Sequence, residues 1–468
     1  MNIQQDAIVR PKKCPGLAPG NLTLVATLGP LILMLATSGP SNAADPVSFR
    51  ADVAPILRDK CLACHGPKKA EGGFRVDAFV HLMREGDSGL AGFTPRELDD
   101  SEVYRRIASE DASERMPLDA DPLPADSIAL FRRWIEQGAS FDGDNPADKL
   151  VTIIPPPTHP KAPESYPFPV PVIAVEFSPD GRELFAGGYH EVTVWDGETG
   201  DLLRRITNVG ERVYAISRSP DGQLLAVGCG APGRHGETRL FRLQTGQLAE
   251  VLGTTSDVVL DVAFNAAGDR LATAGADGTI RLFDVASSDE QLLITSHSDW
   301  VSAVAWSQDG GRLASASRDK TAKVFDSNTG ELLVTYSGHG EPVQGVAFHP
   351  GGKEVYSSGG DNRIHVWKME GAEKTKQFEF EGIVFKLPIG DDFLFAASAD
   401  KTVRQFEPGT QKQLRSFSGH QDWALSVAFN AETRRVASGG FDGRIQIWDS
   451  TDGRAVSSFW AAPGFESD

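Results

Sequence analysis

Two cysteines and a histidine lie close together in a chain of 468 residues that contains only four cysteines. Cys61, Cys64 and His65 have the spacing C-x-x-C-H, which is the attachment signature of a c-type haem. The two thiols can form thioethers to the two vinyl groups of one porphyrin, and the adjacent imidazole can then bind the iron as its proximal ligand. The spacing therefore predicts one covalently attached haem c.

Three other uses of such a cluster agree less well with its surroundings. A thioredoxin-like dithiol requires a βαβ context, whereas the segments on both sides of these residues have helical periodicity. A zinc site requires a second pair of ligands, and the sequence contains no second C-x-x-C and no H-x-x-x-H. A disulfide between Cys61 and Cys64 would leave the adjacent His65 without a role.

Met116 is the candidate for the second axial ligand of the iron. It lies in the irregular, proline-flanked segment SERMPLDADPLP, where a loop can place a thioether on the far face of a porphyrin. Met83 and His81 lie in a segment with amphipathic spacing, so we expect both side chains to serve in packing. The sequence thus predicts His65 and Met116 as the two metal ligands.

The elements that must position these residues are short and helical. The segment VSFRADVAPILRDK leads into Cys61 with apolar residues at helical spacing, and SEVYRRIAS and PADSIALFRRWIEQGA predict two more helices. The connections are glycine-rich and acidic, as expected of a domain in which a bulky prosthetic group supplies much of the core. We therefore predict an all-α cytochrome c domain over residues 45–143.

This region resembles the planctomycete-type cytochrome c domain over nearly its whole length. The resemblance rests on CLACHGPKKAEGGFRVD, SEVYRRI, RMPLDADPLP and RRWIEQGA. It implies that Cys61 and Cys64 bind haem, that His65 is the proximal ligand and that Met116 is the distal one. The family usually has a second proline after Met-Pro, where this chain has Leu118, and this departure leaves the ligand assignment unchanged.

Residues 1–43 have the pattern of a signal peptide. Basic residues at 10–13 precede an apolar stretch of 15 residues, and small residues follow at positions 41 and 43. The apolar stretch is shorter than the roughly 20 residues that a membrane span requires. We therefore expect cleavage and a periplasmic or otherwise extracytoplasmic protein; without cleavage, the segment would attach the chain to a membrane.

Residues 144–171 are rich in proline, and the rest of the chain is repetitive. The proline-rich part predicts a semi-rigid polyproline II linker in which His159 is solvated.

From about residue 172, strands that end in an aromatic residue recur with a period near 42, at Trp195, Phe241, Phe283, Phe325, Trp367, Phe406 and Trp448. This is the WD-repeat pattern of four short strands per unit, so residues 172–460 predict a seven-bladed β-propeller. Seven outer strands can be counted from LLRRI to AVSSF, so we expect the ring to close without a strand from elsewhere in the chain.

Conspicuous polar residues in the repeats have structural explanations. Two sets have the spacing of the WD-repeat hydrogen-bond tetrad, and their recurrence argues against a catalytic triad: His339, Ser357, Asp361 and Trp367, and His420, Ser438, Asp442 and Trp448. The segment GCGAPG matches the dinucleotide-binding pattern G-x-G-x-x-G. However, a strand follows it where that site requires a helix, which excludes the site.

The turns between the second and third strands of the first two blades differ from the later ones. We expect these turns to bring Tyr189, His190, Arg234 and His235 together on one face. Two interpretations stay open: simple loop variation, and a cationic docking patch on an acidic protein. Cys229, close by in the sequence, is expected to be a small buried hydrophobe.

The combined sequence evidence predicts a multidomain chain: a small all-α cytochrome c domain followed by an all-β seven-bladed WD-repeat propeller. The net charge of −18 argues against a nucleic-acid partner. The leading hypothesis is an exported monohaem cytochrome that is not an enzyme, carries single electrons to or from a redox protein partner, and uses its propeller as a protein-docking scaffold. The alternatives are an oxidoreductase whose propeller binds a substrate or a quinone and passes electrons to the haem, and a haem-based sensor with an open coordination position.

Overall fold

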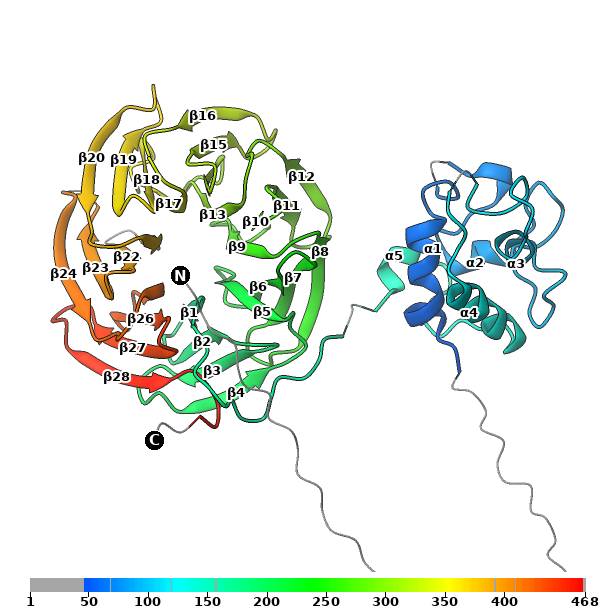
Figure 1. The fold of residues 1–468 in the computed structure, drawn as a ribbon, viewed down its shortest axis with the longest axis horizontal. Coiled ribbons are helices and arrows are strands. Elements are labelled where there is room, and N and C mark those ends of the chain that lie inside the picture. Colours follow the sequence, from blue (N-terminus) through cyan, green and yellow to red (C-terminus); the bar gives the residue numbers. More distant parts are fainter. Residues whose placement is uncertain are drawn as a thin grey trace, which may run out of the picture. The chain divides into compact units, whose positions relative to one another are not determined.

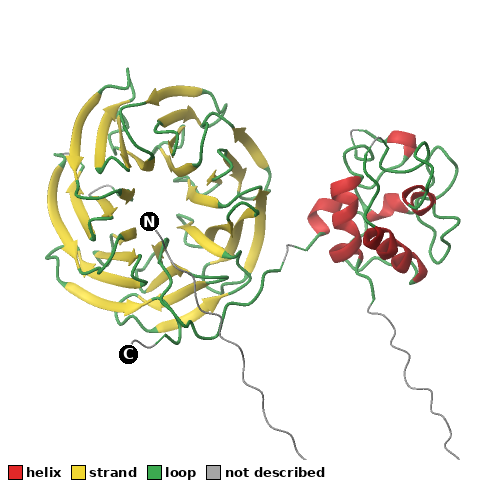
Figure 2. Ribbon diagram, viewed as in Figure 1, coloured by secondary structure: helices red, strands yellow, loops and turns green. Residues whose placement is uncertain are grey.

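The computed structural model describes residues 46–67, 69–118, 120–155, 158–390, 393–408 and 410–465. It divides into two units, with the boundary between Pro155 and Pro156, and a small helical unit is followed by a β-sheet ring, which confirms the predicted fold class (Figures 1 and 2). The predicted signal segment 1–43 lies outside the described residues. Within the described ranges, we find no helix that combines the length and the apolar character needed to cross a bilayer.

The first unit consists of short helices joined by long irregular segments. Its elements are a π-helical turn η1 (Phe49–Val53), α1 (Ala54–Lys60), a 3-10 turn η2 (Glu71–Gly73), α2 (Phe79–Leu82), α3 (Glu102–Ile107), α4 (Ala125–Glu136) and α5 (Leu150–Ile153). The three helices predicted from the sequence are therefore present. The longest, α4, buries Phe131, Trp134 and Ile135 on one face. Phe93 and Phe49 pack against Trp134, with ring centroids 5.2 and 5.4 Å away.

Helix α1 ends where the C-x-x-C-H segment begins. Pro55 lies in its first turn, where a missing N–H group costs nothing. The Cys61 N–H donates to the Leu57 carbonyl at 3.0 Å, and the His65 N–H donates to the Cys61 carbonyl at 2.9 Å. The segment thus continues the last helical turn, which holds both cysteines and the histidine close together.

The second unit is a ring of seven four-stranded antiparallel sheets, each built from four consecutive strands (Figure 1). In chain order the blades are β1 (Val175–Phe177), β2 (Glu183–Gly187), β3 (Val192–Asp196) and β4 (Leu202–Ile206); β5 (Arg212–Arg218), β6 (Leu224–Ala231), β7 (His235–Arg242) and β8 (Leu248–Thr255); β9 (Val259–Phe264), β10 (Arg270–Gly275), β11 (Ile280–Asp284) and β12 (Glu290–Ile294); β13 (Val301–Trp306), β14 (Arg312–Ser317), β15 (Ala322–Asp326) and β16 (Leu332–Tyr336); β17 (Val343–Phe348), β18 (Glu354–Gly359), β19 (Arg363–Lys368) and β20 (Lys374–Glu379); β21 (Val384–Lys386), β22 (Leu394–Ser398), β23 (Thr402–Glu407) and β24 (Lys412–Ser418); and β25 (Ala424–Asn430), β26 (Arg435–Gly440), β27 (Arg444–Asp449) and β28 (Ala455–Trp460).

The second strand of each blade is buried almost along its whole length. In β14 and β22, for example, nearly every residue is buried, which is the pattern of strands covered on both faces. The core of the ring therefore lies between neighbouring sheets, where valine, isoleucine, alanine and phenylalanine side chains meet. The segment GCGAPG spans the end of β6 and the turn before β7, so a strand follows it, as predicted.

The ring closes between β1 and β25 without a shared strand, as predicted. At this seam the Val172 N–H donates to the Gly440 carbonyl at 3.1 Å, and the Ser426 hydroxyl donates to the Val172 carbonyl at 2.9 Å. The Asn430 side-chain amide donates to the Ser178 carbonyl at 3.0 Å. The first and last blades are thus joined by a few hydrogen bonds and apolar contacts.

Residues 158–171, which we call the strap, pack on the propeller, and the prediction that His159 is solvated is wrong. The His159 side chain is only 11% exposed and its Nε2 pairs with the buried carboxylate of Glu237. The Tyr166 hydroxyl donates to the Glu191 carboxylate at 2.6 Å, and the Arg205 guanidinium donates to the Pro163 carbonyl at 2.6 Å. Buried carboxylates require donors, and the strap supplies two of them.

Candidate functional site

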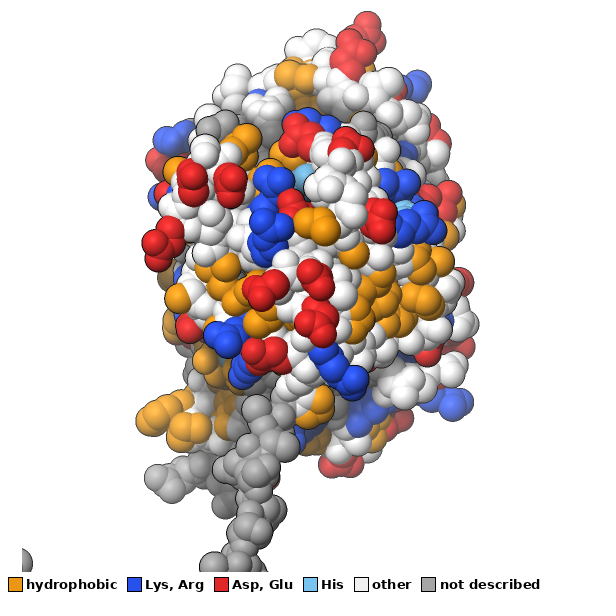
Figure 3. Space-filling view, turned by 90° about the vertical axis from the view of Figure 1, so that its right-hand side faces the viewer, with side chains coloured by type: hydrophobic (Ala, Val, Ile, Leu, Met, Phe, Trp, Pro, Cys, Tyr) orange, Lys and Arg blue, Asp and Glu red, His pale blue; other side chains and the backbone are white. Residues whose placement is uncertain are grey.

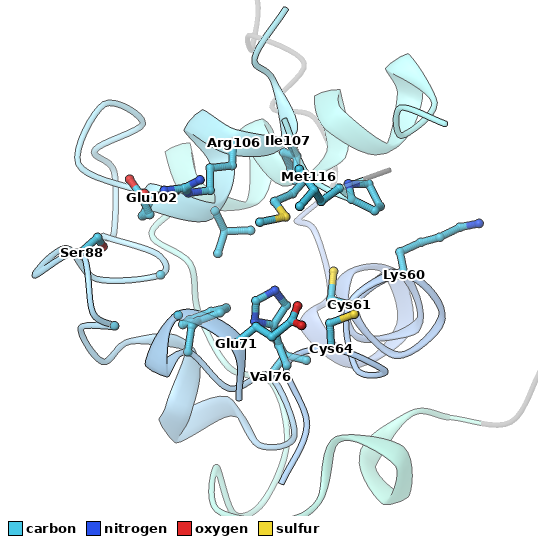
Figure 4. Close-up of a pocket in the computed structure, with 18 of the residues that line it drawn as sticks. Lys60, Cys61, Cys64, Glu71, Val76, Ser88, Glu102, Arg106, Ile107 and Met116 are labelled. Carbon is cyan, nitrogen blue, oxygen red and sulfur yellow. Dashed lines mark hydrogen bonds and ion pairs between the residues drawn. The ribbon is translucent and has the colours of Figure 1, made fainter. Parts of the chain in front are cut away.

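The C-x-x-C-H segment forms part of the wall of a cavity of about 640 Å³ in the helical unit (Figure 4). All four predicted site residues line this cavity: Cys61, Cys64, His65 and Met116. Much of the remaining wall is apolar, with Phe74, Val76, Leu90, Val103, Ile107 and Leu123. Ligand pockets typically have volumes of about 300–1,000 Å³ and a predominantly apolar lining. The structure therefore brings the predicted residues together in a space that suits a large apolar group.

The four residues are distributed over one end and two opposite sides of the cavity. In Figure 4, Cys61 and Cys64 lie at one end, Met116 lies on one side, and Val76 lies on the opposite side. His65 belongs to the Val76 side, because the Val76 N–H donates to the His65 carbonyl at 2.8 Å. A flat group attached to the two cysteines would therefore have His65 and Met116 on its two faces.

Met116 is held by the helix that precedes it. Its N–H donates to the carbonyl of Arg106, near the end of α3, at 3.1 Å. Met83, by contrast, packs against the apolar core, and His81 Nδ1 lies 3.1 Å from the Asp77 carboxylate. Neither of these two is among the described residues that line the cavity. Their roles as ligands or packing residues stay predictions, but only Met116 is placed opposite His65.

The free atoms in the cavity fit a covalently attached haem. His65 lines the cavity, and its buried Nδ1 has no hydrogen-bond partner among the described residues, so no described group there competes with a ligand for this imidazole. Cys61 and Cys64 are both free thiols, so the disulfide alternative loses support. Burial, and secondarily the charge of Cys64, raises the pKa of Cys61 to about 11. Redox-active dithiols instead have a lowered pKa, which argues against the thioredoxin-like alternative.

The histidines of the WD-repeat tetrads are buried between strands. His339 Nδ1 lies 2.8 Å from Asp361, its Nε2 lies 2.9 Å from the Ser357 hydroxyl, and the Trp367 indole donates to the same hydroxyl at 3.0 Å. His420 makes the equivalent contacts with Asp442 and Ser438. The tetrads are therefore structural, as predicted.

A third set of the same kind was missed by the sequence analysis. His297 lies 2.8 Å from Asp319 and 2.7 Å from the Ser315 hydroxyl. Phe325 stands at the position of the tetrad tryptophan, so the motif keeps an aromatic ring there but lacks the indole N–H donor. The spacing of the histidine, serine and aspartate alone would have found it.

One tetrad carries an additional histidine, His365, whose ring stacks on His339. The nitrogens of these two rings and a carboxylate oxygen of Asp361 lie within 4.8 Å of one another, as in a metal site. However, the rings are nearly parallel, 12° apart, with centroids at 4.0 Å. A metal ion lies close to the plane of each imidazole that binds it, and two stacked parallel planes do not meet at one ion. We conclude that the cluster serves packing and not metal binding.

The altered turns of the first two blades both contact the strap through His159. The Tyr189 and His190 rings are 4.5 Å apart, and the His159 ring from the strap lies 6.2 Å from His190 and 6.1 Å from His235. Arg234 pairs with Glu211 at 2.7 Å. This face therefore holds part of the chain itself. Cys229 beneath it is fully buried, as predicted.

The innermost strands of the propeller line a second cavity of about 470 Å³. The charged residues of its lining are paired: Lys386 pairs with Asp261 at 2.9 Å, and Glu176 pairs with Arg218 at 3.2 Å. Burial raises the pKa of Glu176 to about 7, against the lowering effect of Arg218. Each pair joins strands of two different blades, so a structural role in holding the ring together accounts for both pairs.

Comparison with known proteins agrees with this two-part organisation. The family model "Planctomycete cytochrome C" matches residues 61–119, and "WD domain, G-beta repeat" matches residues 246–284, 289–326, 330–368 and 411–449.

Curated proteins match short parts of the chain. Ribosome assembly protein 4 of Saccharomyces cerevisiae is 32% identical over 91 residues, which are 19% of this chain and 18% of the relative. The U3 small nucleolar RNA-associated protein 15 homolog of Xenopus tropicalis is 32% identical over 100 residues (21% and 19%). The Denticleless protein homolog of Danio rerio is 44% identical over 62 residues (13% and 10%). The chain thus spans less than a fifth of the length of these relatives.

Proposed function

We propose that this chain, which joins a planctomycete-type cytochrome c domain to a seven-bladed WD-repeat propeller, is an exported monohaem cytochrome that carries single electrons. The observation that carries the proposal is the convergence of Cys61, Cys64, His65 and Met116 on one cavity. In the proposal, the two thiols attach the haem and the imidazole and the thioether bind its iron. When bound, the haem supplies a one-electron ferric–ferrous couple.

The residues around the cavity favour electron transfer over the binding of small ligands. His65 and Met116 would fill both axial positions, so neither is left open. The apolar wall formed by residues such as Phe74, Val103 and Ile107 excludes water from the group that it surrounds. A neutral thioether ligand raises the reduction potential relative to a second imidazole. These features support a carrier more than a sensor.

The propeller is proposed to dock protein partners. Aromatic side chains, which are enriched at interface centres, are half-exposed on its loops: Trp300 at 45%, Trp423 at 43% and Phe441 at 49%. The helical unit, which faces the viewer in Figure 3, has acidic and basic side chains interspersed with apolar ones. Such a mixed surface suits a redox protein partner at this unit, whereas a polyanion requires a cationic one.

Export is part of the proposal and rests on the sequence alone. The pattern of residues 1–43 and the C-x-x-C-H segment support it together, because haem attachment to this motif takes place outside the cytoplasmic membrane in other c-type cytochromes. Expression without residues 1–43 should give protein without haem. Full haem loading of that truncated form in the cytoplasm would contradict the export proposal.

The spectrum of the purified full-length protein tests the electron-carrier proposal. Wild-type protein should contain one covalent haem that is low-spin in both oxidation states and does not take up carbon monoxide. Met116→Ala should open the site and give a high-spin or water-bound iron that takes up carbon monoxide readily. Met83→Ala is the matched control, because Met83 packs against the core outside the cavity and its loss should leave the spectrum unchanged.

The same measurement separates the two alternatives. Wild-type protein that is already high-spin would favour a haem-based sensor and contradict the assignment of Met116. Reduction of the haem by free quinols or sugars, without any protein partner, would favour an oxidoreductase.

A further inference from the structure

We propose that Arg106 binds the propionate groups of the haem and so fixes the orientation of the porphyrin in the cavity; this inference rests on the proposed function. The argument begins with the shape of haem itself. Its two vinyl groups lie on one half of the macrocycle, and its two propionate carboxylates lie on the other half. Attachment of the vinyl groups to Cys61 and Cys64 therefore directs the propionates to the opposite end of the cavity.

The end of the cavity away from the cysteines carries Arg106. In Figure 4, Cys61, Cys64 and Lys60 lie at one end, whereas Arg106 and Glu102 lie at the other. Both Glu102 and Arg106 belong to α3. The propionates would therefore arrive beside this helix.

Among the described residues, three cations line the cavity, and two of them lie at the wrong end. Lys60 directly precedes Cys61. Lys69 Nζ lies 4.0 Å from Cys64 Sγ and pairs with Glu71 at 2.7 Å. Arg106 is the remaining described cation, and it is at the propionate end. The position of the cations thus singles out one residue.

The propionate carboxylates require a cation at this end of the cavity. The Glu102 side chain is only 16% exposed and also lines the cavity, so two further carboxylates beside it would be strongly disfavoured without a cation. Arg106 pairs with Glu102 through Nε, at 2.8 Å. Its two Nη atoms have no hydrogen-bond partner within the described ranges and are available to form the two-pronged contact that guanidinium makes with carboxylates.

The same residue holds the segment of the second axial ligand. The Arg106 carbonyl accepts the N–H of Met116 at 3.1 Å. One residue of α3 would therefore contact the haem carboxylates with its side chain and the Met116 segment with its backbone. A change at the propionate end would reach the iron by this short path.

The chain offers a matched control on the same helix. Arg105 also pairs with Glu102, at 3.2 Å, but its side chain is 53% exposed and it is not one of the described residues that line the cavity. Replacing either arginine by glutamine removes one positive charge and one ion pair with the same carboxylate. Only Arg106→Gln should remove a contact with the haem.

The test uses the full-length protein with its haem attached. Loss of a positive charge beside the haem favours the ferric state, so R106Q should lower the midpoint potential and shift the propionate bending vibrations in the resonance Raman spectrum. R105Q should leave both close to wild type. R106K should keep most of the potential, because the charge remains, but should still shift the propionate vibrations, because the fork geometry is lost.

The outcomes separate this inference from the proposed function. Protein without covalent haem would refute the proposed function itself. Normal haem attachment with R106Q and R105Q indistinguishable in both measurements would overturn the role of Arg106 alone. If R106Q does not fold, R106K decides the matter: unchanged propionate vibrations in R106K would overturn the inference, and shifted ones would support it.

Discussion

Removal of the Tyr166 hydroxyl should weaken the attachment of the strap to the propeller and lower the stability of the ring. This hydroxyl donates at 2.6 Å to the carboxylate of Glu191, a residue with no exposed surface. Burial, followed by the hydrogen bond to Glu191, raises the pKa of Tyr166, so the hydroxyl stays protonated and remains a donor at every ordinary pH. Arg205 continues to bind Glu191 in the variant, at 2.8 Å, so the carboxylate keeps one partner.

The size of the effect follows from the charge of the acceptor. A hydrogen bond to a charged group contributes about 1.5–3 kcal/mol, and the loss of a partner leaves part of a buried carboxylate unsatisfied. We therefore expect Tyr166→Phe to lower the free energy of unfolding of the propeller by about 1.5–3 kcal/mol. Tyr189→Phe is the control, because the Tyr189 side chain is 42% exposed and exposed substitutions usually change stability by less than about 0.5 kcal/mol.

Urea unfolding followed by tryptophan fluorescence measures this difference. Trp134 is the one tryptophan of the eight that lies outside the propeller, so the signal reports mainly on the ring. The midpoint should fall in Tyr166→Phe while the slope of the transition stays constant. Equal unfolding free energies for the two variants would refute the conclusion that the strap is part of the propeller.

Three further predictions concern other parts of the molecule. Burial, and secondarily the neighbouring charge of His339, lowers the pKa of His365 to about 4, whereas the unfolded value is about 6.5. Between these two pH values the unfolded chain binds a proton that the folded chain does not. The free energy of unfolding of the propeller should therefore fall by up to about 3 kcal/mol as the pH falls from 6.5 to 4. His365→Arg should reduce this loss in pH-dependent unfolding. Arg281 occupies the same place in blade 3, where it pairs at 3.0 Å with Asp277, the aspartate equivalent to Asp361. Gly92→Ala should lower the free energy of unfolding of the helical unit by about 1–3 kcal/mol and reduce the haem yield, because the added Cβ would overlap the Phe74 ring in the cavity wall. An unchanged thermal midpoint and a normal haem yield would contradict this. A propeller fragment that begins at residue 172 should be less stable in urea than one that begins at residue 158, and equal midpoints would speak against a stabilising strap.

Local patterns in the sequence predicted the features that are local in the structure. The C-x-x-C-H segment lies within one turn after α1, and the aromatic residue that ends each third strand marks a blade whose four strands are consecutive. The tetrads could be predicted because the histidine, the serine and the aspartate lie close together in the sequence: His339 and Asp361 are 22 residues apart, and Ser357 lies between them. Met116 could be singled out because its segment is irregular and flanked by prolines.

The features that the sequence did not predict depend on distant partners or on helical phase. His159 is buried because Glu237 and Asn208 bind it, and both are far from it in the sequence. A proline-rich composition says that the strap is extended, but it does not say what the strap contacts. Likewise, nothing in SEVYRRI distinguishes Arg105 from Arg106 until α3 is oriented by the burial of Ile107.

The way in which the ring closes affects how the propeller can form during synthesis. Since every sheet is made from four consecutive strands, each blade can complete its own backbone pairing as soon as those strands have left the ribosome. In a ring closed by a shared strand, the first strand would have to wait, with unpaired edges, for the end of the chain. Here only the seam of Val172, Ser426 and Asn430 must wait for the last blade. The nascent chain therefore exposes complete sheets rather than a lone strand, which reduces the risk of pairing with a second chain before synthesis ends.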